Sequence, residues 1–72
     1  MQLFGVKGFP PDGAIPVMVW HTRAMTAERA EELVGQLPQA AGLRLEAIDI
    51  GHTAQAEGVF REMSWPWPNK AV

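Results

Sequence analysis

Runs of bulky apolar residues separated by turn signals occur along the first part of the chain, in the pattern of β-strands. Residues 2–9 carry bulky apolar side chains and predict a first strand. The Pro-Pro-Asp-Gly sequence at residues 10–13 is typical of a turn. Residues 15–22 predict a second strand that pairs antiparallel with the first, and residues 43–50 predict a third. The second strand is apolar on both faces, which predicts a central strand or one covered on both sides.

Two segments carry apolar residues at the spacing of an amphipathic helix. Thr26 is a candidate N-cap for the first helix, which we expect to end near Gln36, because Pro38 disfavours helical geometry at the residue before it. Thr53 is a candidate N-cap for a second helix that ends before Trp65. The apolar stripe of this second segment consists of Ala56, Val59, Phe60 and Met63.

The predicted element order is strand, strand, helix, strand, helix and an extended C-terminal tail. This order predicts an α+β fold in which two helices pack on a small three-stranded sheet (β-β-α-β-α). A chain of 72 residues fits one domain. We expect residues 1–63 to form that compact domain and residues 64–72 to form the extended tail.

The tail is rich in tryptophan and proline and is the most distinctive feature of the sequence. Pro66 and Pro68 hold the backbone extended, whereas Trp65 and Trp67 gain most when their rings are buried. Trp20, the third tryptophan, is expected in the core. We expect the tail rings either to fold back on the domain or to dock on a second copy or another protein.

The charge pattern offers a second candidate interaction patch. Three glutamates lie near the start of the first predicted helix: Glu28, Glu31 and Glu32. Carboxylates at this position also complement the helix dipole, which is the simpler interpretation. The net charge is −2 and the basic residues are scattered, so the composition argues against a general duplex-DNA binder. No apolar stretch is long enough to span a bilayer, and no signal peptide is expected.

Groups suited to catalysis are scarce, because the chain has no cysteine or tyrosine and its only serine is Ser64. No catalytic residue, cofactor or metal site is therefore predicted. The alternative is a ligand or metal site formed by His21, His52 and Asp49. Both histidines fall at ends of predicted strands, and a shared sheet edge would bring them together. The sequence lacks the close ligand spacing, such as HxH, that is typical of metal sites.

These features favour a small non-catalytic interaction module: a modulator, inhibitor or accessory subunit that docks on a protein partner or forms a homodimer. A small enzyme that binds a ligand or metal is the alternative, and a nucleic-acid-associated protein that stacks tryptophan on bases is a weaker one. The absence of cysteine suits the cytoplasm. Short chains without cysteine are also common among phage and mobile-element proteins, which makes that origin an expectation by association.

Overall fold

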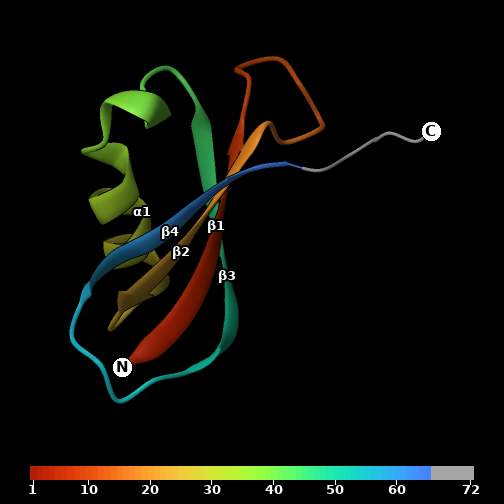
Figure 1. Ribbon diagram of the computed structural model, residues 1–72. Helices are drawn as coiled ribbons and strands as arrows, with labels where there is room; N and C mark the ends of the chain where they lie inside the picture. The colour runs from red at the N-terminus through yellow and green to blue at the C-terminus, as the bar shows by residue number, and fades with distance from the viewer. Residues whose placement is uncertain (66–72) are drawn as a thin grey trace.

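A four-stranded antiparallel sheet forms the frame of the protein in the computed structural model, which describes residues 1–65 (Figure 1). The strands are β1 (Gln2–Phe9), β2 (Met18–Ala24), β3 (Arg44–His52) and β4 (Gly58–Ser64). Their order across the sheet is β3-β1-β2-β4, so β1 and β2 are central and β3 and β4 are edges. Helix α1 (Ala27–Gly35) and a short 3₁₀ turn, η1 (Pro38–Ala40), connect β2 to β3.

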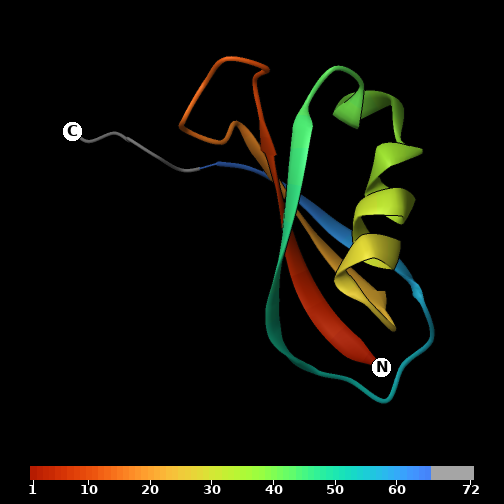
Figure 2. The same ribbon diagram turned by 180° about the vertical axis from the view of Figure 1, so that it is seen from behind.

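Helix α1 packs against one face of the sheet, as the two opposite views in Figures 1 and 2 show. It contacts all four strands. Within residues 1–65, no helix covers the other side. We call this uncovered side the open face.

The core lies between α1 and the sheet. Its buried apolar residues are Phe4, Val6, Trp20, Ala24, Ala30, Val34 and Ala40. Trp20 is fully buried, which confirms its predicted place, and its indole N–H donates a hydrogen bond to Glu62 of β4 over 2.8 Å. The side chains of β1 and β2 that fill the core occupy alternate positions, as expected for strands with one face against a helix.

Several sequence predictions are confirmed. Strand β1 has the expected bounds and pairs antiparallel with β2. Thr26 caps α1, because its side-chain oxygen accepts the backbone N–H of Arg29 over 3.1 Å.

The second strand begins three residues later than expected, at Met18, and extends to Ala24. Strand β3 likewise runs on to His52.

The prediction of a three-stranded sheet with two helices (β-β-α-β-α) is wrong. The segment Gly58–Ser64, expected to be helical, forms β4 and pairs antiparallel with β2. Such a short apolar segment does not distinguish a helical stripe from a strand by periodicity. Its Val59 and Phe60 favour a strand when a neighbour supplies pairing, and Gly58 has a φ of +153°, which does not belong to a helix.

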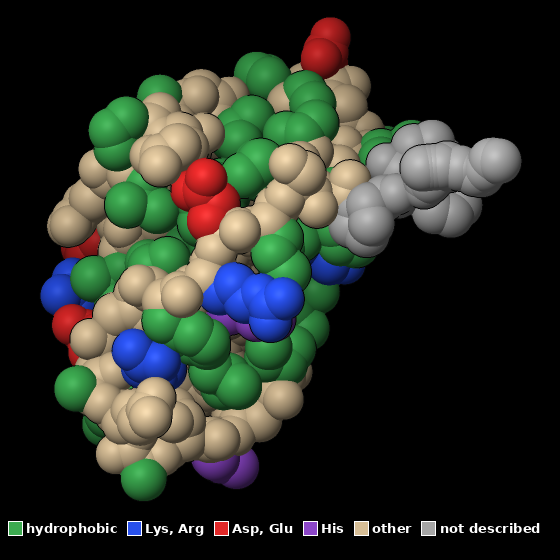
Figure 3. Space-filling model, in the orientation of Figure 1, with side chains coloured by type: hydrophobic (Ala, Val, Ile, Leu, Met, Phe, Trp, Pro, Cys, Tyr) green, Lys and Arg blue, Asp and Glu red, His purple; other side chains and the backbone are tan. Residues whose placement is uncertain are grey.

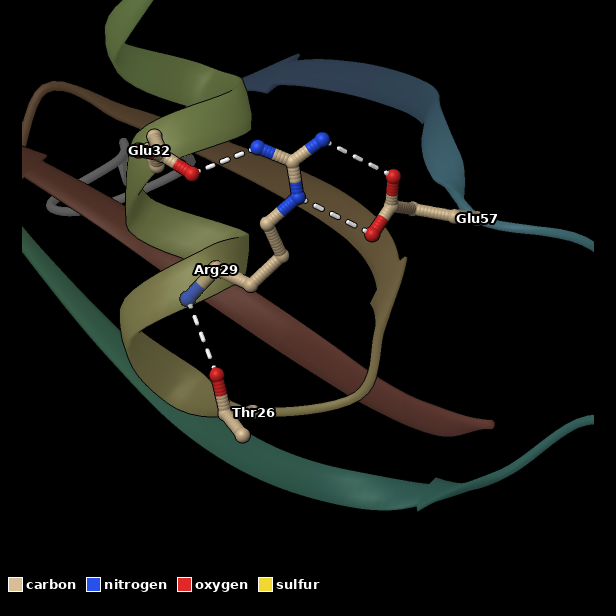
Figure 4. Close-up of polar contacts among 4 residues, drawn as sticks. All are labelled: Thr26, Arg29, Glu32 and Glu57. Atoms are coloured by element: carbon tan, nitrogen blue, oxygen red, sulfur yellow. Dashed lines mark hydrogen bonds and ion pairs between the residues drawn. The ribbon is translucent and has the colours of Figure 1, made fainter.

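A branched polar contact ties the start of α1 to the residue before β4 (Figure 4). The guanidinium of Arg29 binds both carboxylate oxygens of Glu57, with Nε–Oε2 at 3.0 Å and Nη2–Oε1 at 3.1 Å. The same guanidinium also binds Glu32. Hydrogen bonding to Arg29 lowers the pKa of Glu57 below its ordinary value.

This contact predicts a pH-dependent contribution to stability. The folded-state pKa of Glu57 is depressed, so its contribution is present above the ordinary glutamate pKa of about 4.3 and is lost as the pH falls through the lowered value. The melting temperature of Glu57→Gln should therefore lie below that of the native protein at neutral pH and approach it in acid. The difference should be small, because the pair is solvent-accessible. In an Arg29→Met background, Glu57→Gln should show no such pH dependence; a dependence that persists there would contradict the assignment.

Candidate functional site

The open face contains a groove at the centre of the sheet. Residues next to the core positions point to this side, because successive side chains of a strand point to opposite faces. The groove encloses about 300 Å³ and is lined by Gly5, Lys7, Val19, His21, Ile48, Ile50 and Trp65. Most of this lining is apolar, which is unusual for a sheet face that no other layer covers.

Two β-bulges, one on each edge strand, bring further apolar side chains to this face. The register between β1 and β3 shifts beside Leu3 and Phe4, where Ile50 is the extra residue. The register between β2 and β4 shifts beside His21 and Thr22, where Phe60 is the extra residue. Bulges commonly redirect a side chain at a sheet edge. Ile50 lines the groove, and the ring of Phe60 lies 6.0 Å from that of His21, so both extra residues reach the open face.

Basic side chains lie over the aromatic rings of the sheet. Lys7 Nζ is 5.4 Å from the centroid of the Trp65 ring, and the guanidinium of Arg23 is 4.3 Å from that of Phe60. Arg61 is exposed and lies across from His21. On the face drawn in Figure 3, hydrophobic side chains lie beside lysine, arginine and histidine side chains. The open face therefore combines apolar surface with positive charge.

Two arginines use some of their N–H donors within the protein. Arg23 donates from Nε to the carbonyl of Ala56 over 2.6 Å. Arg44, which lies 4.9 Å from the Phe9 ring, donates to the carbonyl of Gly13 over 3.1 Å. These guanidinium groups are held by the protein itself and pin its loops.

The predicted tail residues divide at the limit of the described chain. Ser64 belongs to β4, and the backbone N–H of Trp65 donates to the carbonyl of Val17 over 3.0 Å, which continues the pairing by one residue. The Trp65 ring forms one wall of the groove, and its indole N–H is buried without an acceptor among residues 1–65. The other predicted tail residues lie outside the described residues: Pro66, Trp67 and Pro68.

The acidic patch on α1 is largely used within the protein. Glu31 accepts the backbone N–H of Ala47 in β3 over 3.0 Å. Glu32 binds Arg29, whereas Glu28 is exposed in the first turn of the helix. The patch belongs to α1 and so lies on the side of the sheet opposite the groove.

The structure does not bring together the residues of the predicted ligand site. His21 lies in the middle of β2 across from Gly5 and lines the groove. His52 pairs with Gln2 at the far end of β1. Asp49 accepts hydrogen bonds from the Gln2 side chain over 2.6 Å and from the Gly51 N–H over 3.0 Å. In the part of the chain described, no group of three or more His, Asp or Glu side chains could hold a metal ion.

Most groove residues were not predicted as a site. A signal was present, because the second predicted strand and the second half of the third are apolar on both faces. Val19, Ile48 and Ile50 produce this pattern. No open apolar face was predicted, because two helices were expected to pack on the sheet.

Comparison of the chain with protein-family models, with curated proteins and with solved structures finds no match. No helix between residues 1 and 65 is long and apolar enough to cross a membrane. Function is therefore inferred from the residues of the open face.

Proposed function

We propose that the chain is a small non-catalytic interaction module that binds a protein partner on the open face of its sheet. The observation that carries this proposal is the exposure of three large apolar side chains on that face: 41% for Ile48, 48% for Ile50 and 44% for Phe60. Fully burying an exposed side chain of this kind contributes roughly 1.5–3 kcal/mol, and covering the exposed half that remains here would contribute about half of that. Ile48 and Ile50 line the groove from β3, whereas Phe60 lies beside His21 from β4 at the opposite edge, so exposed apolar side chains are spread across the face. Exposed apolar surface of this extent on a small domain is typical of a binding surface.

The charges of the open face favour a partner with carboxylates beside its apolar residues. Lys7 and Arg61 flank the apolar side chains, and Glu46, across from Lys7, offsets only part of their charge. A second copy docked face to face would bring together two faces of the same net positive charge, which is unfavourable. Homodimerisation through this face is therefore the less favoured arrangement, although the sequence predicts a dimer.

Nucleic acid fits this surface less well than protein. Stacking of bases requires free aromatic ring faces, whereas Arg23 lies over the Phe60 ring and Lys7 over the Trp65 ring. The rest of the groove lining is mainly aliphatic: Val19, Ile48 and Ile50. The Arg23 guanidinium is already engaged by the carbonyl of Ala56 and the side chain of Gln55. A cytoplasmic location, which the lack of cysteine favours, remains a prediction.

The test is selection of peptides from a random display library on the immobilised full chain. We expect enrichment of sequences that combine Asp or Glu with Leu, Ile or Phe. Ile50→Asp should weaken binding of the selected peptides by more than about tenfold (~1.4 kcal/mol), because it places a charge on the apolar contact. Met25→Asp is the matched control, because Met25 is 69% exposed and lies between β2 and α1, away from the groove.

Three results would overturn the proposal. The first is a selection without enriched peptides, or one whose peptides bind Ile50→Asp as well as the native chain. The second is a stable homodimer in sedimentation that Ile50→Asp dissociates, since the face would then be occupied by a second copy. The third is tight, salt-sensitive binding of a single-stranded oligonucleotide that Ile50→Asp abolishes.

A further inference from the structure

We infer that the groove on the open face is an anchor pocket that receives one large apolar side chain of an acidic partner segment, with Gly5 as its floor. This inference rests on the proposed function and specifies where the partner is held. The pocket walls come from β1, β2, β3 and Trp65, so the anchor side chain would contact three of the four strands and the residue that follows the fourth.

Gly5 is the first observation behind this inference. It lies in the interior of β1, across from His21 on one side and Ile48 on the other. Glycine weakens the interior of a strand and often marks a position where another molecule or backbone approaches closely. A glycine kept at the centre of the sheet therefore requires an explanation.

Crowding within the protein does not explain Gly5. A Cβ atom there would lie 3.7 Å from Ile50 Cγ2, which is an ordinary van der Waals contact. The contrast is Gly8 in the same strand, where a Cβ atom would lie only 2.9 Å from both Leu43 Cδ1 and Trp20 Cζ3. The core thus requires glycine at position 8, whereas at position 5 glycine keeps the groove open.

The polar groups around the groove define the rest of the partner segment. Lys7 follows on the same face of β1, and its ammonium group lies beside the Trp65 ring at the groove wall. A carboxylate next to the anchor side chain would pair with this ammonium group. The indole N–H of Trp65 lacks an acceptor within the described chain, and a partner carbonyl would supply one if docking turned the ring.

The decisive experiment fills the pocket and measures binding of the tightest peptide from the display selection. Gly5→Val places a branched side chain over the groove floor. We expect the free protein to stay folded with a similar melting temperature, because the exposed Ile50 side chain, 3.7 Å from the new Cβ atom, can turn aside for the valine methyl groups. The affinity for the peptide should fall by more than about tenfold. Gly5→Ala provides a milder variant with ordinary contacts and should give an intermediate loss.

A double-mutant cycle distinguishes the contribution of the pocket to peptide binding from that of the rest of the open face. Changing the peptide's anchor residue to alanine should weaken binding to the native chain but have little further effect on binding to Gly5→Val. Lys7→Glu should lower affinity for the acidic peptide while leaving its dependence on the anchor residue intact. If Ile50→Asp abolishes binding but neither Gly5 variant changes it, the anchor pocket is refuted and the docking face stands. If neither Ile50→Asp nor the Gly5 variants change binding, the docking face is refuted as well.

Discussion

Alanine in place of Trp20 is expected to remove most of the protein's free energy of unfolding. Trp20 is fully buried at the centre of the core, where its ring packs under α1 and its indole N–H is paired with Glu62. Removing a buried tryptophan side chain costs about 3–5 kcal/mol, which approaches the ~5 kcal/mol that marginally stable small domains possess in total. Urea unfolding followed by far-ultraviolet circular dichroism would measure the loss.

Trp65→Ala is the control for this prediction. Trp65 is half-buried on the open face, and its indole N–H has no acceptor within residues 1–65. Its loss should therefore lower the free energy of unfolding by less than half as much and preserve a cooperative transition. A larger effect of Trp65→Ala than of Trp20→Ala would contradict the assignment of Trp20 as the central core residue.

Gly8→Ala is expected to lower the free energy of unfolding by about 1–3 kcal/mol, because overpacking strains a filled core. The added Cβ atom would lie 2.9 Å from the rigid, buried ring of Trp20 as well as from the side chain of Leu43. Leu43 can shift at low cost, but the ring is fully enclosed. The midpoint of chemical unfolding at unchanged slope would report this loss.

Gly5→Ala is the matched substitution in the same strand. Its Cβ atom meets only Ile50 at an ordinary distance, so the free energy of unfolding should be unchanged or should rise. Equal destabilisation by the two substitutions would show that both faces of β1 are equally crowded. That outcome would contradict the open groove and the anchor pocket together.

The parts of the fold that could be predicted from the sequence are those with local signals. Turn residues fix the end of β1, and the oxygen of Thr26 fixes the start of α1. Trp20 stands in a segment apolar on both faces, which indicates a central strand. These features depend only on residues close together in the sequence and on the spacing of apolar side chains.

Strand β4 could not be predicted in the same way, because its conformation depends on pairing with β2, about forty residues earlier. The apolar residues Val59, Phe60 and Met63 fit a short helical stripe as well as a bulged strand. This error also concealed the site, since a second helix would have left less of the sheet uncovered. The exposure of Ile50 and Phe60 further depends on the register shifts in β3 and β4, which only strand pairing specifies.

The hydrogen bond from Ala47 to Glu31 bears on how copies of the chain could join through their sheets. The Glu31 carboxylate of α1 accepts the backbone N–H of Ala47 in β3, so another strand that pairs with β3 must first displace this carboxylate. No such contact is described for β4, the other edge strand. A filament that grows without limit needs two edge strands open to pairing on every molecule, whereas one open edge strand allows only a dimer. Removing this carboxylate by Glu31→Ala would therefore open a route from bounded pairs to fibrous aggregation.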